Sequence, residues 1–333
     1  MKRYVKVLFA LIILVLLIYF LLNINFLEVY NVLQKISTFY FFLAFISYSL
    51  AFLMFNLRST YSLKWIVRPD FWFFQKTTLA GFFINTITPG AQIGGDPLKA
   101  YILSKKYKKP FSKIFGAIFA DKIIHTLISL FFILFSVLFL ITFIPLPSGL
   151  TFILQIFLFL IFLVFAIIPL FSIIKTKLNL KFTLRKLKWL AWLNPVKNNE
   201  KLQKEIGKKL GSFTKSFRKT ITNKKIFTMG IIFSLIYWFL NYLVSYFLFL
   251  SLGFEINFFF VIIVVSLGSL VGVFSPSPGG VGFIEGFMIF LYSIIGINFA
   301  TAVVVSLLSR MIFYFHSLIV GGISLISLKK YFK

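Results

Sequence analysis

Cysteine is absent from this 333-residue chain, and acidic residues are scarce: 8 Asp and Glu stand against 35 Lys and Arg. The missing thiols exclude disulfide scaffolds, thiolate metal sites and cysteine nucleophiles. Only 13% of the residues are charged and 60% are hydrophobic, whereas a soluble domain is about half apolar and about a quarter charged. Because apolar runs of about 18 residues or more recur along the chain, its composition excludes a soluble globular protein.

The formal net charge of +27 would indicate nucleic-acid binding in a soluble protein. In a membrane protein, the same excess predicts basic loops on the cytoplasmic side, and we favour this explanation over nucleic acid. The N-terminus begins with charged residues and continues into an apolar run, as a signal peptide does. No cleavage site of small residues follows the run, so we expect an uncleaved first helix.

Six apolar stretches are long enough to cross a bilayer. They are 4–22, 39–57, 114–142, 151–174, 226–252 and 299–328. Two further apolar stretches, 71–103 and 258–296, are each interrupted by a cluster of proline and glycine. Such interruptions predict broken helices, which membranes tolerate where the backbone lines protein or water.

The basic residues assign a side to each end of the interrupted stretches. Arg58, Lys64 and Arg68 place the start of 71–103 inside, and lysines between positions 99 and 113 place its end inside as well. By the same reasoning, 258–296 begins and ends outside. We therefore predict an all-α polytopic membrane protein, with six full spans and two re-entrant broken-helix hairpins that enter from opposite faces.

The order span, span, hairpin, span occurs twice, so we predict an inverted repeat, as in many alternating-access transporters. Repeat one covers about 1–142 and repeat two about 151–328, within a single membrane domain, 1–333. The spacings agree, because seven residues separate Pro89 from Asp96 and also Pro278 from Glu285. Twenty-five residues separate Asp96 from Asp121 and likewise Glu285 from Arg310.

Ionisable groups inside a bilayer are costly and are functional candidates by default. Asp96, Asp121, Glu285 and Arg310 are such groups. The alternative is an internal lock, in which Arg310 pairs with Glu285 or Asp121. Asp96 followed by proline is also typical of a helix N-cap, whereas a cap would not account for Glu285, which we place about two turns into its half-helix.

Two further polar residues follow Asp121 in the same span. Lys122 is expected to extend to the inner surface. His125 lies one turn beyond Asp121 and is either a proton relay or a packed core residue. The chain has no cluster with metal-ligand spacing, no Walker-type loop and no nucleophile elbow, so we predict no metal, no cofactor and no enzyme activity.

The interruptions resemble motifs of the membrane region of lysylphosphatidylglycerol synthases and of related stand-alone flippase-like membrane proteins. The resemblance covers nearly the whole chain. Lysine stands at positions 99 and 122, where the family usually has arginine, and histidine at position 125, where an acidic residue is common. The matching residues, which the resemblance implies line a translocation path, are Thr88, Pro89, Gly94, Gly95, Asp96, Lys99, Asp121, Lys122, Pro278, Gly279, Gly280, Gly282, Glu285 and Arg310.

The resemblance implies a transporter that moves an anionic, aminoacylated or polyprenyl-phosphate-linked lipid between leaflets. The soluble synthase domain is missing, so movement of a lipid rather than its synthesis is expected. Two alternatives are an intramembrane enzyme acting on a lipid-linked phosphate and a small-solute or ion transporter. Chemically altered lipid would distinguish the enzyme.

The expected location is the cytoplasmic membrane, with both termini in the cytoplasm and with membrane lipids as partners; a homo-oligomer is compatible with the sequence. Segment 175–225 is strongly basic, and its apolar residues recur at helical spacing. This pattern predicts an amphipathic cytoplasmic helix attracted to anionic headgroups, with a docking site for a partner protein as the alternative. Its apolar face consists of Leu202, Ile206, Leu210, Phe213 and Phe217.

Overall fold

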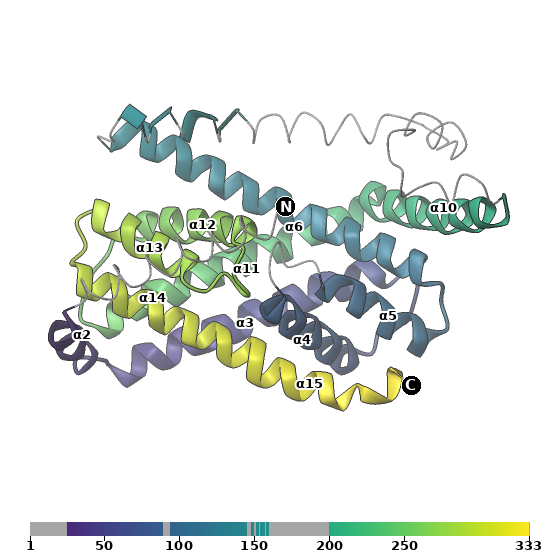
Figure 1. Cartoon of the computed structure of the whole chain (residues 1–333), viewed down its shortest axis with the longest axis horizontal. Coiled ribbons are helices and arrows are strands. Elements are labelled where there is room, and N and C mark those ends of the chain that lie inside the picture. Colours follow the sequence, from purple (N-terminus) through teal and green to yellow (C-terminus); the bar gives the residue numbers. More distant parts are fainter. Residues whose placement is uncertain are drawn as a thin grey trace, which may run out of the picture.

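The computed structural model describes residues 25–88, 94–144, 148–149, 151–152, 154–156, 158–159 and 200–332. These residues form helices and no β-strand, which confirms the all-α class (Figure 1). Four helices are long and apolar enough to cross a membrane: α3 (Thr38–Leu63), α6 (Phe111–Phe143), α11 (Lys224–Ser251) and the continuous helix Phe299–Ser327. The predicted span 4–22, most of 151–174 and Pro89 lie outside the described residues.

Asparagine and aspartate side chains set where several helices begin, because their oxygens accept backbone N–H groups of the first turn. Asp70 accepts from Phe73 N at 3.2 Å and so caps α4 (Phe71–Ile87). This hydrogen bond, followed by that from Lys106, holds the pKa of the Asp70 carboxyl below its usual value. Asparagines cap four other helices in the same way: Asn25 for α2 (Phe26–Leu33), Asn223 for α11, Asn257 for α12 (Phe258–Phe274) and Asn298 for the helix from Phe299.

One expectation about the first repeat needs correction, at the span that follows α2. The second span, expected to end near residue 57, continues as α3 to Leu63. Arg58 therefore lies inside a helix, 2% exposed, and not in a cytoplasmic loop.

Two pairs of shorter helices pack between the long ones. In each pair the partners lie against one another: α4 with α5 (Gly95–Tyr107), and α12 with α13 (Phe283–Ile294). Each pair also contacts a long helix from the other half of the chain. Helix α4 packs against the end of the final helix, and α12 packs against α6.

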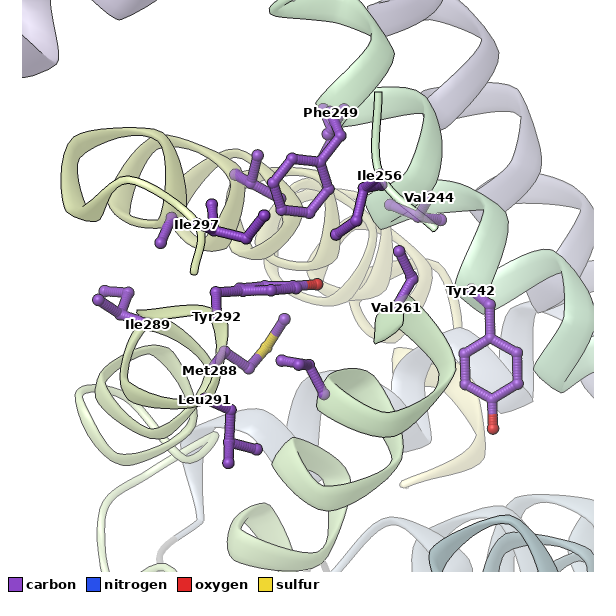
Figure 2. Packing of buried hydrophobic residues seen from close by; sticks show 14 of the residues in the cluster. Tyr242, Val244, Phe249, Ile256, Val261, Met288, Ile289, Leu291, Tyr292 and Ile297 are labelled. Atoms are coloured by element: carbon purple, nitrogen blue, oxygen red, sulfur yellow. The ribbon is translucent and has the colours of Figure 1, made fainter. Parts of the chain in front are cut away.

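The largest apolar cluster joins α11, α12, α13 and the following helix (Figure 2). Tyr292 of α13 is fully buried against Phe249 of α11, with ring centroids 5.0 Å apart. Tyr242 and Ser266 share a hydrogen bond of 2.8 Å within it. A second cluster joins α4, α5 and the start of α6 around the fully buried Phe74.

The final helix consists of α14 (Phe299–Tyr314), a π-helical segment η2 (Phe315–Val320) and α15 (Gly321–Ser327). His316, within η2, donates from Nδ1 to Ile312 O at 2.9 Å, and its Nε2 lies 2.9 Å from Ser49 Oγ on α3. At Gly321 the helix passes close to α4, because a Cβ there would lie 2.8 Å from Leu79 O.

Helix α10 (Glu200–Thr222) packs along the start of α6. Phe213 and Phe217 lie against Phe119, with ring centroids 5.9 Å apart in both pairs. This part of the predicted lipid-facing stripe therefore contacts protein. In Figure 1, α10, the end of α5 and the C-terminus lie at one end of the molecule, and α2 lies at the other.

Candidate functional site

A cavity of about 420 Å³ lies among the long helices and both pairs of shorter helices. Four basic residues and two acidic residues line it: Arg58, Lys99, Lys122 and Arg310 against Asp96 and Asp121. Gly95 and His125 also line it. Of the other predicted site residues that the structure describes, Thr88, Gly94, Pro278, Gly279, Gly280, Gly282 and Glu285 are not among those that line the cavity.

Asp121 of α6 pairs with Arg58 of α3. Arg58 Nε donates to Asp121 Oδ1 at 3.0 Å and Arg58 Nη2 donates to Oδ2 at 3.2 Å, which makes a two-pronged ion pair. The two side chains are 2% and 4% exposed. A buried pair with this geometry satisfies both carboxylate oxygens and orients the guanidinium.

Asp96, in the first turn of α5, pairs with Lys122 of α6 at 2.7 Å. Lys122, predicted to extend to the inner surface, lines the cavity, where its ammonium meets this carboxylate. The predicted N-cap at Asp96 is wrong: it would start the helix at Pro97, whereas α5 begins two residues earlier, at Gly95, with Gly94 as its N-cap. It begins there because Asn85 of α4 accepts the Gly95 N–H at 2.7 Å. The first N–H groups of a helix have no acceptor within the helix, and Asn85 supplies one.

Lys99 lies one turn after Asp96 and is 4% exposed. Its ammonium donates to Ser59 Oγ at 2.8 Å and to Thr78 Oγ1 at 2.7 Å. Among the described residues, no carboxylate oxygen lies within 4.0 Å of it. The cavity therefore holds a buried cation that is hydrogen-bonded by neutral groups only.

Glu285 pairs with Arg310, as one of the predicted locks proposed. Arg310 Nε donates to Glu285 Oε1 at 2.7 Å, and Arg310 Nη2 donates to Gly279 O and to the Tyr314 hydroxyl. Glu285 Oε2 accepts the Gly282 N–H at 2.7 Å. The expectation that no cap accounts for Glu285 is therefore wrong: α13 begins at Phe283, so this carboxylate caps the helix and binds Arg310 at once.

Glycine is required in both interruptions, for two different reasons. Gly279, Gly280 and Gly282 have φ of 61°, 76° and 81°, which is left-handed backbone that other residues rarely adopt. At Gly95, a Cβ would collide with the backbone of Gly81 on α4. Thr88 follows the last residue of α4, and its hydroxyl donates to Ile84 O, in the last turn of the same helix, at 2.7 Å.

His125 packs among aromatic rings of α11 and α3. Its ring stacks on Trp238 at 5.9 Å and meets Tyr237 edge-on at 5.0 Å, and its Nδ1 has no hydrogen-bond partner. The predicted contact with Asp121 is absent, because Arg58 occupies that carboxylate. In the described part of the chain, no three His, Asp or Glu side chains gather as metal ligands do.

Sequence reasoning missed the α3 and α4 side of the cavity. Arg58, Ser59 and Thr78 all line it, yet the polar run after residue 55 reads as the start of a loop. One signal was available. If Arg310 binds Glu285, then Asp121 needs another cation, and Arg58 directly follows the predicted span 39–57.

Comparison with known proteins finds matches over most of the chain. The family described as "Lysylphosphatidylglycerol synthase TM region" matches residues 6–321. The UPF0104 membrane protein PH1989 of Pyrococcus horikoshii is 25% identical over 258 residues, which cover 75% of each chain. Two UPF0104 membrane proteins of Methanothermobacter thermautotrophicus are 24% and 25% identical, over 70% and 90% of this chain and 69% and 86% of their own lengths.

Proposed function

Since the chain belongs to the family of the lysylphosphatidylglycerol synthase TM region, we propose that it moves a phosphate-bearing lipid headgroup between the leaflets of the cell membrane. The headgroup passes through the charged cavity while the acyl or prenyl tails stay in the bilayer. A charged group at the bilayer centre costs several kcal/mol. A polar passage lowers this barrier.

Re-entrant hairpins in an inverted repeat are part of this proposal. Helices α4 and α5 have 17 and 13 residues, so they extend about 26 and 20 Å, less than the hydrocarbon thickness of about 30 Å. In both halves, an acid in the first turn of the second short helix pairs with a cation on the next long helix. The pairs are Asp96 with Lys122, 26 residues apart, and Glu285 with Arg310, 25 apart.

The orientation is also proposed. One end of the molecule contains the end of α5, helix α10 and the C-terminus (Figure 1). All three of these segments carry lysines. Cytoplasmic segments carry such an excess of basic residues. We therefore place this end, with the C-terminus, on the cytoplasmic side, and Lys2, Arg3 and Lys6 place the N-terminus there by the same rule.

The size and charge of the cavity favour a headgroup as its occupant. About 420 Å³ is within the range of small-molecule sites, about 300–1,000 Å³. Its lining draws charged residues from both halves, with Asp96 and Lys99 from the first and Arg310 from the second. The observation that carries the proposal is Lys99, a buried cation bonded only by hydroxyls and suited to the negative charge of a phosphate.

The test is leaflet exchange in proteoliposomes containing acyl-labelled fluorescent phosphatidylglycerol, whose outer-leaflet fraction dithionite bleaches. We expect the wild type to exchange the probe faster than protein-free vesicles. Lys99→Met should slow exchange about tenfold, equivalent to about 1.4 kcal/mol in the barrier. Lys105→Met removes the same charge from an exposed position on the same helix and should leave the rate unchanged.

Two outcomes would contradict the proposal: exchange no faster than in protein-free vesicles, or a wild-type rate in the Lys99→Met variant. Mass spectrometry of the recovered lipid distinguishes transport from an enzyme reaction. We expect the probe to be recovered with its mass unchanged. A chemically altered probe would favour an intramembrane enzyme instead.

A further inference from the structure

The carboxylates around the cavity already have cationic partners. The chain contains 8 acidic residues, of which five lie in helices α2 and α10 or in loops outside the membrane-spanning helices. The remaining three are Asp96, Asp121 and Glu285. Each forms an ion pair with a side chain of this protein, at 2.7, 3.0 and 2.7 Å respectively.

Two of these pairs, those of Asp121 and Glu285, are buried, whereas Lys122 and Asp96 are 41% and 26% exposed. Asp121 uses both oxygens on Arg58, and Glu285 uses one on Arg310 and the other on the Gly282 N–H. Removing one partner from a buried pair leaves an uncompensated charge, which is destabilising. To pair with Asp121 or Glu285, a cationic group on a ligand would have to displace Arg58 or Arg310 and leave it buried without its carboxylate.

The surroundings of Lys99 offer neutral acceptors, and none of the described carboxylates lies within 4.0 Å of its ammonium. Two of the three N–H bonds of its ammonium point to Ser59 and Thr78. The Thr78 hydroxyl donates onward to Asn56 Oδ1 at 3.0 Å, which leaves the buried Asn56 Nδ2 without a partner. A buried ammonium whose acceptors are all neutral is suited to an additional, anionic acceptor.

From these contacts we propose that the cavity selects headgroups by charge: it accepts phosphate lipids of net negative charge and excludes lipids whose phosphate is offset by an amino group. The inference rests on the proposed transport function and narrows its substrate class. A phosphate supplies the anionic partner that the Lys99 ammonium does not have among the described residues. An aminoacyl group adds positive charge near Arg58, Lys122 and Arg310, and no unpaired carboxylate lines the described part of the cavity to receive it.

The test uses the wild-type protein in proteoliposomes with three acyl-labelled probes: phosphatidylglycerol, its alanyl ester and its lysyl ester. Their headgroups carry net charges of about −1, 0 and +1, which follow from the side-chain and phosphate charges. We expect exchange to slow along this series, with phosphatidylglycerol exchanging at least about tenfold faster than the lysyl ester. The reason is that a cationic headgroup is repelled by the cations that line the cavity.

The Lys99→Glu variant reverses the charge at this position, so it should reduce or invert the preference between phosphatidylglycerol and its lysyl ester. Lys105→Glu, exposed on the same helix, should keep the wild-type order. If Lys99→Glu fails to fold, the wild-type series alone decides the question.

The outcomes separate the two proposals. If the lysyl ester exchanges as fast as phosphatidylglycerol, the charge selection is wrong and transport stands. If none of the three probes exchanges above the protein-free rate, the transport function itself fails.

Discussion

Arg58 and Asp121 show how strongly the interior depends on individual charge pairs. Their two side chains are almost fully buried, and the carboxylate receives two N–H groups from one guanidinium. Burial removes hydration from both ions, so each depends on the other. The pair joins α3 to α6 next to the cavity.

Asp121→Asn should therefore destabilise the protein by about 3 kcal/mol, because Arg58 remains buried without a counter-charge. Replacing both residues, as in Arg58→Met with Asp121→Leu, should recover most of that loss. Thermal unfolding in detergent measures both variants against the wild type. A single variant that melts like the wild type, or a double variant less stable than the single, would contradict the interpretation of the pair.

The residue scale also shows where sequence reasoning reached its limit. The Glu285–Arg310 pair was foreseen as one alternative, because both residues had to lie in apolar surroundings. The partners of Asp96 and Asp121 were not foreseen. A sequence indicates how far along a helix a lysine or arginine lies, but not toward which neighbour its long side chain turns, so Lys122 and Arg58 were both assigned to the membrane surface.

Among the elements, the crossing of α4 and α5 is the tightest contact. Gly81 and Gly95 bring the two backbones together, and a Cβ on Gly95 would overlap the Gly81 carbonyl. The neighbouring hydrogen bond from Gly95 N to Asn85 depends on the same approach. This crossing positions Asp96 and Lys99 at the cavity.

Gly95→Ala should push the two helices apart and cost about 1–3 kcal/mol. Gly286→Ala is the matched control. Gly286 lies inside α13, where an added Cβ would meet no atom within 4 Å, so alanine there should stabilise the helix by about 0.5–1 kcal/mol. Unfolding midpoints of the two variants in the same detergent provide the comparison. Equal shifts in the two variants would rule out the close approach as the cause.

The helices themselves were largely predictable. Long apolar runs predicted α3, α6, α11 and the final helix to within a few residues, apart from the end of α3. The residue at which each helix begins is harder to predict, since it depends on side chains nearby. Asn85 on another helix lets α5 begin at Gly95, and Glu285 accepts the Gly282 N–H and so caps α13. The first contact comes from tertiary packing and the second from a side chain that caps its own helix, and apolar periodicity records neither.

For the molecule as a whole, the distribution of basic residues makes a prediction about sidedness. The chain has no cysteine, so single cysteines can be introduced and labelled without background. Lys105 and Lys330 are exposed at the basic end, and Glu255 is exposed in the loop between α11 and α12. We place the first two inside the cell and the third outside.

In intact cells, a membrane-impermeant maleimide should label Glu255→Cys and leave Lys105→Cys and Lys330→Cys unlabelled until the membrane is permeabilised. The three substitutions are at exposed positions, so the fold should be unaffected. Labelling of all three from the same side would overturn the proposed arrangement of the spans between these positions and, with it, the passage between leaflets.

The π-helical segment in the final helix has a consequence for the direction of the chain beyond it. A π turn contains more residues than an α turn, so it shifts the azimuth of every side chain that follows. Gly321, directly after the segment, is the residue that meets Leu79 of α4. The rotational phase of the last two helical turns is thus set by six residues, Phe315–Val320, and one residue more in this segment would present Val320 to α4 in place of Gly321.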